Sequence, residues 1–223
     1  VLGVSLEEIN ISAAVRQHFN DIGQDMSMHD VTYENAQARE RTQILMDIAN
    51  MRAALVVGTG DLSELALGWA TYNGDHMSMY SVNASVPKTV MRRMLNALAK
   101  GSENNELKHI LKDVVDTPVS PELLPSDGSK QGHKTEDIVG PYELHDFFIY
   151  YSLIYGFTAS KIYRMACRAF VNEFTRPEIY KWLYTFYKRF FSQQFKRSCM
   201  PDSPKATVLS LSGRADLAFG YKC

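Results

Sequence analysis

A short apolar run that ends at a glycine-rich turn constrains the fold of this chain more than any other feature. Residues 53–57 are apolar throughout, and Gly58-Thr59-Gly60 follows directly. An uninterrupted run of this length is typical of a strand buried on both faces of a parallel sheet. Asp61 or Ser63 can then cap a helix that continues through Leu67. The order of strand, turn and helix predicts an α/β fold with a parallel sheet.

The segments before this run continue the alternation of strand and helix. Residues 6–11 have an apolar and β-branched pattern that favours a strand, and Ser12 can cap a helix over 13–19. The spacing at 33–49 predicts an amphipathic helix that ends near Asn50. Its apolar stripe consists of Ile44, Leu45, Ile48 and Ala49.

The rest of the chain is predicted to be helical around one long loop. Pro87 suits the start of a helix over 88–100, and a turn follows at 101–105. Residues 117–140 are rich in proline and glycine, which is typical of a flexible active-site loop. Three helices are expected after it, over 142–155, 158–173 and 177–195. We interpret the chain as one domain with a sheet-containing part (1–116), this loop, and a helical C-terminal part (141–223).

Composition excludes several classes of protein. With 45% hydrophobic and 22% charged residues among 223, the chain resembles a folded globular domain, and its net charge of −1 gives no general attraction to nucleic acid or anionic membranes. No apolar run approaches the roughly 20 residues that span a bilayer, and the N-terminus lacks the basic-then-apolar order of a secretory signal. Three cysteines without zinc-binding spacing favour a reducing, cytoplasmic compartment: Cys167, Cys199 and Cys223.

The turn after the apolar run is a candidate nucleotide site. Open parallel sheets bind ligands at the carboxyl ends of their strands, where helix N-termini offer backbone donors. Gly58 and Gly60 would let the backbone approach a phosphate closely, and Thr59 offers a hydroxyl group. Glu64 offers a hard oxygen ligand for magnesium. A purely structural Gly-Thr-Gly turn is the alternative, and local spacing does not decide between the two.

Two basic positions could serve the same site. Asn35 and Arg39 lie four residues apart and share a helix face, whereas Arg41 should project elsewhere. Lys88 follows Pro87 at a helix start, where backbone donors and an ammonium group together favour a phosphate. A solvated helix face and an exposed lysine are the alternatives.

The aromatic and basic stretch at 184–197 resembles a platform for nucleic acid. Helical spacing favours a packed helix with a basic outer face instead, because its packed side would consist of Trp182, Phe186, Arg189 and Phe190. His145 and Asp146 are adjacent, so they should diverge on a helix, and we interpret the histidine as structural. Nothing in the sequence supplies the context of a nucleophile elbow or an activated thiol, so no covalent catalysis is expected.

Six segments in order resemble the NAD synthetases, in particular the synthetase domain of the long, glutamine-dependent form, and the resemblance covers nearly the whole chain. They are NAQARER (35–41), LVVGTGDLSELALGW (55–69), NASVPKT (83–89), DTPVSPEL (116–123), TEDIVGPYELHDF (135–147) and QFKRS (194–198). The resemblance implies a Rossmann-like domain of the adenine-nucleotide α-hydrolase type. It also implies a reaction in which ATP adenylates the nicotinate carboxylate of deamido-NAD, releasing pyrophosphate, and ammonia then gives NAD and AMP.

The resemblance also implies roles for individual residues. ATP would contact Thr59, Lys88 and Ser120, and Glu64 would hold magnesium. Deamido-NAD would contact Asn35, Arg39, Trp69, Ala70, Thr71, Tyr72, Asp75 and Lys196. The tail at 211–217 departs from the ending expected of the family and carries no assignment.

Two features of the family are absent from the sequence. One is the Ser-Gly-Gly-x-Asp-Ser type loop that holds the pyrophosphate end of ATP, and the other is the glutaminase domain that supplies ammonia. Because the chain opens at Val1 within an apparent strand, we expect it to be a piece of a longer, homo-oligomeric enzyme. The alternatives are a non-catalytic module that binds a dinucleotide or self-associates, and an ATP pyrophosphatase acting on another acceptor.

Overall fold

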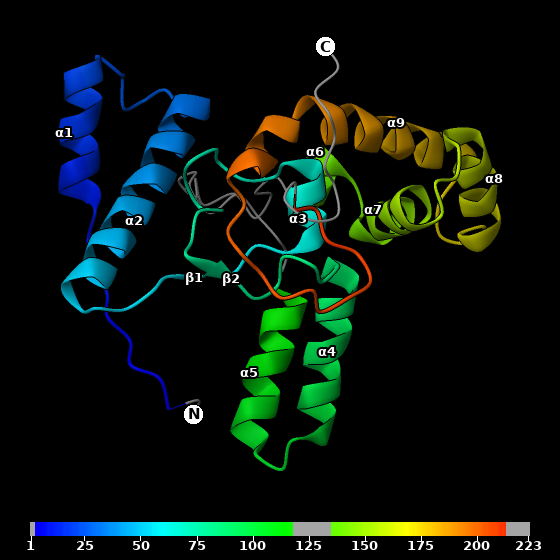
Figure 1. The fold of residues 1–223 in the computed structure, drawn as a ribbon, viewed down its shortest axis with the longest axis horizontal. Coiled ribbons are helices and arrows are strands. Elements are labelled where there is room, and N and C mark those ends of the chain that lie inside the picture. The colour runs from blue at the N-terminus through cyan, green and yellow to red at the C-terminus, as the bar shows by residue number, and fades with distance from the viewer. Residues whose placement is uncertain (1–2, 118–134, 213–223) are drawn as a thin grey trace.

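A small parallel sheet lies among helices in the computed structural model, which describes residues 3–117 and 135–212 (Figure 1). The strands are β1 (Val57–Gly58) and β2 (Tyr80–Ser81). The α-helices are α1 (Ser12–Ile22), α2 (Val31–Met51), α3 (Leu62–Leu67), α4 (Lys88–Gly101), α5 (Asn105–Asp116), α6 (Thr135–Val139), α7 (Tyr142–Ile149), α8 (Ala159–Ala169) and α9 (Arg176–Ser192). A π-helical turn, η1 (Tyr150–Ile154), extends α7, and a 3-10 turn, η2 (Gln194–Cys199), follows α9.

The sheet is parallel, which confirms the predicted α/β class. Val57 pairs with Tyr80 and Gly58 with Ser81. Asp202 extends the ladder by a parallel bridge to Tyr80, and its carbonyl accepts a hydrogen bond from the Ser81 amide at 2.9 Å. The strand β2 lies in the polar stretch at 74–87, for which the sequence predicts no regular element.

Two strand predictions are wrong. Only the last residue of the run at 53–57 belongs to β1, and Leu55 and Val57 are 58% and 50% exposed rather than buried on both faces. In the described part of the chain, β1 pairs only with β2. Residues 6–11 are irregular, with Leu6 94% exposed, and form no strand.

The helices α1 and α2 form a separate hairpin at the left of Figure 1. Both were predicted, but Ile11 rather than Ser12 is the N-cap of α1, and Ser12 is already the first helical residue, with its amide bound by the Asn10 side chain at 2.8 Å. The pair packs on a small core of Val15, Phe19 and Ala36. The predicted stripe on α2 is only partly buried, since Leu45 is 53% exposed.

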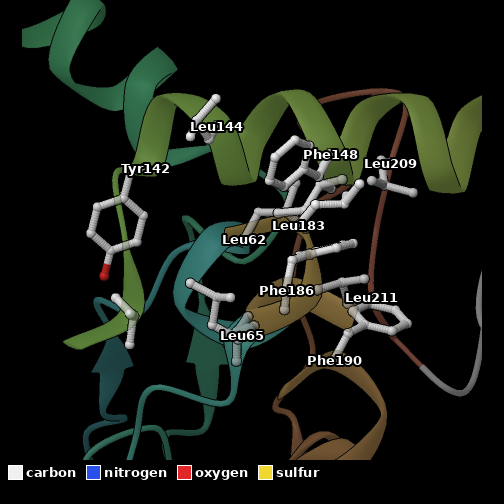
Figure 2. Packing of buried hydrophobic residues seen from close by; sticks show 14 of the residues in the cluster. Leu62, Leu65, Tyr142, Leu144, Phe148, Leu183, Phe186, Phe190, Leu209 and Leu211 are labelled. Atoms are coloured by element: carbon white, nitrogen blue, oxygen red, sulfur yellow. The ribbon is translucent and has the colours of Figure 1, made fainter. Parts of the chain in front are cut away.

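The main core lies between α3, α7, α8 and α9 (Figure 2). Phe148 of α7 and Phe186 of α9 are almost fully buried and lie against each other, with ring centroids 5.9 Å apart. Leu62 and Leu65 of α3 enter the same core, so burial fixes the short helix that follows the glycine-rich turn. The predicted packing of α9 through Phe186 and Phe190 is confirmed.

The helices α4 and α5 pack together as a hairpin that projects below the sheet in Figure 1, and α5 was not predicted. Residues 118–134 of the predicted loop lie outside the described residues. At its end the prediction of a loop is wrong, because Thr135–Val139 form α6, which packs on α9 with Val139 fully buried. No helix in the described ranges is both long and apolar enough to cross a membrane.

Candidate functional site

The helix α3 begins at the end of β1 and is held there by a capping box. The Asp61 carboxylate accepts a hydrogen bond from the Glu64 amide at 2.9 Å, and the Glu64 carboxylate accepts one from the Asp61 amide at 3.2 Å. Asp61 is 1% exposed. The prediction that Asp61 or Ser63 caps this helix is therefore confirmed for Asp61.

Lys88 lies between the two carboxylates of this cap. Its Nζ is 2.6 Å from Asp61 Oδ2 and 2.7 Å from Glu64 Oε1. The structure thus joins two residues with separate predicted roles, Lys88 for phosphate and Glu64 for magnesium, into one cluster. Thr59 lies on the exposed turn, two residues before Asp61, and Ser120 lies outside the described residues. We call Asp61, Glu64 and Lys88 the acidic cluster.

The acidic cluster is electrostatically unbalanced. Burial raises the pKa of Asp61 to about 7, the nearby Glu64 carboxylate adds to the rise, and the Lys88 ammonium opposes it. Burial disfavours the charge of Lys88, but the two carboxylates outweigh it and raise the pKa of this lysine. Two acids and one base leave a net negative charge when all are ionised, which a proton or a second cation can neutralise.

The raised pKa of Asp61 predicts a dependence of stability on pH. Its ordinary value is 3.8 and its folded value about 7, so its contribution is favourable at low pH and is lost as pH rises through 7. Asp61→Asn keeps a capping side chain but cannot titrate. We expect its free energy of unfolding, measured in urea at pH 4.5, 6 and 8, to fall less with pH than that of the unmodified chain. Parallel curves would contradict the assignment.

Asp146 fixes the acidic cluster from α7, a role that the sequence did not reveal. Its carboxylate accepts hydrogen bonds from the Thr89 amide at 2.9 Å and from the Ser63 hydroxyl, and that hydroxyl also accepts from the Lys88 amide at 2.9 Å. One buried carboxylate thus joins the N-termini of α3 and α4, and burial raises its pKa. No local spacing could signal this contact, since Asp146 is 57 residues from Thr89.

The neighbouring His145 is structural, as interpreted from the sequence. Its ring is fully buried, and Nε2 lies 2.6 Å from the Val139 carbonyl. Burial lowers the pKa of His145 to about 4, so the ring stays neutral at physiological pH. It ties α7 to α6 rather than to the acidic cluster.

A second cluster surrounds the loop that follows α3, residues 68–76. Asn35 Oδ1 accepts from the Thr71 hydroxyl at 2.8 Å, and Arg39 Nε donates to the Tyr72 carbonyl at 3.3 Å. Asp75 Oδ1 accepts from the Thr71 amide at 2.6 Å. Lys196 Nζ donates to the Gly68 and Ala70 carbonyls at 2.9 and 2.6 Å. The structure therefore brings together every residue predicted to contact deamido-NAD, and these hydrogen bonds of Asn35, Arg39 and Lys196 are with the loop itself.

Arg189 belongs to this second cluster and was assigned only to packing. Its Nε donates to the Leu67 carbonyl at 2.9 Å, and its guanidinium lies 5.1 Å from the centroid of the Trp69 ring. Burial lowers the pKa of Lys196, the charge of Arg189 lowers it further, and Asp75 opposes the change. Among the described residues neither cation forms a salt bridge, so this half-buried region is positively charged.

The two clusters lie at opposite ends of α3. The Trp69 amide donates to the Glu64 carbonyl at 2.9 Å, so the loop starts directly from the helix that carries the acidic cluster. Six helical residues span about 9 Å, which is within the length of a dinucleotide. An extended anionic ligand could therefore reach from the positively charged loop to the acidic cluster.

These elements define a Rossmann-like α/β domain in which the acidic cluster lies just after the end of β1. A sequence model of the NAD synthase family matches residues 1–153, and the chain belongs to this family, as the resemblance predicted. It is 41% identical over 229 residues to the glutamine-dependent NAD(+) synthetase of Mycobacterium tuberculosis, and 39% identical to that of Mycobacterium leprae. Each match covers 92% of this chain and 34% of the relative, so the chain spans about a third of their length.

Solved structures show the same fold. A glutamine-dependent NAD(+) synthetase from Cytophaga hutchinsonii superposes with a TM-score of 0.75 at 21% identity, over 98% of this chain and 34% of that one. The NMN synthetase from Francisella tularensis superposes with a TM-score of 0.58 at 19% identity, over 94% of this chain and 67% of that one. These likenesses support the predicted Rossmann-like class.

Proposed function

We propose that this chain forms the deamido-NAD surface and part of the ATP site of an NAD synthetase. In the reaction, the nicotinate carboxylate of deamido-NAD attacks the α-phosphorus of ATP, and pyrophosphate leaves. Ammonia then attacks the acyl-adenylate, loses a proton, and expels AMP to leave the amide of NAD. One observation carries this proposal. The cations Arg189 and Lys196 lie against the 68–76 loop at one end of α3, and the acidic cluster lies at the other end.

The loop cluster suits an anionic dinucleotide. An ammonium group has three hydrogen-bond donors, and Lys196 uses two of them on the Gly68 and Ala70 carbonyls. Arg189 uses its Nε on the Leu67 carbonyl, which leaves the terminal nitrogens of its guanidinium for a ligand. Because both cations are partly desolvated, their attraction for a phosphate or carboxylate is stronger than at an exposed site. The Trp69 ring beside Arg189 adds a flat surface for a base or pyridine ring.

The acidic cluster fits magnesium bound together with ATP. Mg²⁺ is usually held by one or two carboxylates plus phosphate oxygens and water. Glu64 and Asp61 would supply those carboxylates, and no group of three or more potential ligands occurs among the described residues. When bound, magnesium would neutralise charge on the departing pyrophosphate. Lys88 would then be free to exchange a carboxylate for a phosphate oxygen, with Thr59 on the adjacent turn as a further ATP contact.

The wider setting is part of the same proposal. Ammonia would come from glutamine through a glutaminase domain that this chain does not contain, and the enzyme would be a cytoplasmic homo-oligomer with no nucleic-acid or membrane partner. Leu55 and Val57 are exposed at and just before β1, which pairs only with β2 in the described ranges, and this arrangement favours pairing with further polypeptide. This exposure also supports the second candidate function, a non-catalytic module that binds a dinucleotide or self-associates.

Calorimetry with the 223-residue chain tests the proposed ligand surface. We expect deamido-NAD to bind more tightly than NAD, because its carboxylate adds a negative charge opposite Arg189 and Lys196. Lys196→Met should weaken this binding about tenfold or more, since a charge-assisted hydrogen bond contributes about 1.5–3 kcal/mol. Lys100→Met, at the exposed end of α4, is the matched control and should bind as the unmodified chain does. Equal affinity for the two dinucleotides would contradict the proposal.

A turnover assay separates the two candidate functions. With ATP, magnesium, deamido-NAD and ammonium, we expect the 223-residue chain to form no measurable NAD, because its sequence has no Ser-Gly-Gly-x-Asp-Ser type loop to hold the pyrophosphate. NAD formation would show that this loop is dispensable. Absence of both turnover and deamido-NAD binding would favour self-association.

A further inference from the structure

A cysteine and a histidine 123 residues apart meet behind the deamido-NAD loop. The ring of His76 is 8% exposed, and its two nitrogens contact different partners. Nδ1 lies 2.7 Å from the Thr71 carbonyl oxygen, and Nε2 lies 2.9 Å from Cys199 Sγ. Neither residue was singled out for this site in the sequence, and the dinucleotide-binding role proposed above does not use either of them.

The contacts determine where the protons lie. A carbonyl oxygen can only accept, so His76 Nδ1 carries the hydrogen of the 2.7 Å bond. In the neutral ring Nε2 is then an acceptor, and Cys199 can donate its S–H hydrogen to it at 2.9 Å, a shorter contact than the 3.5 Å from the sulfur to the Lys196 carbonyl. Burial raises the pKa of the Cys199 thiol, although the Asn73 amide opposes this by donating to the sulfur, so the thiol stays protonated at neutral pH.

Cys199, His76 and the turn η2 contact the 68–76 loop at several points. Asn73, between Thr71 and His76 in the loop, lies in the left-handed region with φ of 55°. Cys199 ends η2, the same turn that carries Lys196 with its bonds to Gly68 and Ala70. One 3-10 turn therefore holds the loop at its beginning through Lys196 and at its end through the contact of Cys199 with His76.

Thr71 is the residue on which these contacts converge. Its amide is bound by Asp75, its hydroxyl by Asn35, and its carbonyl by His76. Of these three side chains, His76 is the most deeply buried, and Cys199 is a second partner that orients it. A ring with only one fixed nitrogen could change tautomer or flip, and the Thr71 carbonyl would then keep only its hydrogen bond from the Gly74 amide, at 3.0 Å.

We propose that Cys199 and His76 form a positioning pair, in which the thiol fixes the tautomer of His76 and the imidazole orients the Thr71 carbonyl and the dinucleotide-binding loop. The pair is not catalytic, because neither group is placed to touch reacting atoms. Its effect on ligand binding rests on the proposed deamido-NAD function, whereas the coupling of thiol to tautomer does not.

Substitutions with matched hydrogen-bonding capacity test the pair in the full 223-residue chain. Cys199→Ala removes the donor, and Cys199→Ser restores one. His76→Leu removes both contacts, whereas the amide of His76→Gln can donate to Thr71 and accept from Cys199. Cys167→Ala, which removes the other described free thiol, on α8, is the control. The readouts are the ¹⁵N shifts of the His76 ring, hydrogen exchange over residues 69–76, and the Kd for deamido-NAD.

We expect the Nδ1–H tautomer in the unmodified chain, in Cys199→Ser and in Cys167→Ala, and a mixture of tautomers with faster loop exchange in Cys199→Ala. The Kd should rise about fivefold in Cys199→Ala and His76→Leu and stay within about twofold in Cys199→Ser and His76→Gln. An unchanged tautomer in Cys199→Ala, or equal changes in Ala and Ser, would overturn the pair. If the unmodified chain binds no deamido-NAD, the proposed function fails, and the tautomer still decides the pair.

Discussion

Lys88→Met is expected to lower the free energy of unfolding by about 2–3 kcal/mol at pH 9, because the ammonium is what allows the buried Asp61 to ionise, and each pH unit above its pKa of about 7 is equivalent to about 1.4 kcal/mol. Asp61 is 1% exposed, and Lys88 Nζ is the only cation that the described residues place against it in a salt bridge. Without the ammonium, two carboxylates face each other with no compensating charge. Urea denaturation of the chain measures the loss directly.

The loss should depend on pH with a definite sign. In Lys88→Met the folded pKa of Asp61 rises above its value of about 7, while the unfolded value stays near 3.8. The variant is therefore least affected below about pH 4 and loses stability as pH rises through the folded pKa. The difference from the unmodified chain should be small up to about pH 7, where Asp61 is protonated in both proteins, and should grow between pH 7 and 9, where Asp61 ionises only in the unmodified chain.

A double substitution separates charge from packing. In Lys88→Met with Asp61→Asn, the carboxylate is gone and the neutral amide still caps α3, so most of the lost stability should return. If the double variant is as unstable as the single one at pH 9, the ammonium contributes by filling space rather than by compensating Asp61. A deficit that does not change with pH would lead to the same conclusion.

The acidic cluster also shows how far the sequence could predict the site. Asp61 and Glu64 lie three residues apart, so their capping box follows from helix geometry alone. The start of α4 at Lys88 follows from Pro87 in the same way. The contact between Lys88 and that box depends on how two helices pack, and a sequence pattern carries no information about that distance. Asp146 was missed for the same reason.

The contacts around the 68–76 loop were also predictable only where they depend on local spacing. Asn35 and Arg39 were expected to share a face because of their spacing, and both contact the loop, as that spacing predicts. Cys199 and His76 are 123 residues apart in the sequence, and the residues next to them in the sequence do not indicate that the two side chains are in contact. The strand β2 has two residues and depends on β1 and Asp202 for its hydrogen bonds, so its own sequence gave no signal.

Gly68→Ala is the second substitution with a large expected effect, about 2–5 kcal/mol of lost stability together with at least a tenfold weaker affinity for deamido-NAD. Gly68 ends α3 with φ of 58°, a conformation that costs an L-residue about 1–2 kcal/mol. An added Cβ would also lie 2.3 Å from the Cβ of Gln193, just before η2. Relief of this overlap requires α3 and η2 to move apart, at a further cost of about 1–3 kcal/mol.

Gly23 supplies a matched control, because it ends α1 in the same left-handed conformation, with φ of 70°, and an added Cβ there meets nothing within 4 Å. Gly23→Ala should therefore lose only about 1–2 kcal/mol, the cost of the backbone conformation alone, and leave deamido-NAD binding unchanged. Gly68→Ala combined with Gln193→Gly removes the overlap but keeps the strained backbone, so its stability should approach that of Gly23→Ala. If it does and affinity also recovers, the loop depends on the close contact of α3 with η2. If stability recovers but affinity does not, the Gly68 conformation itself orients the loop.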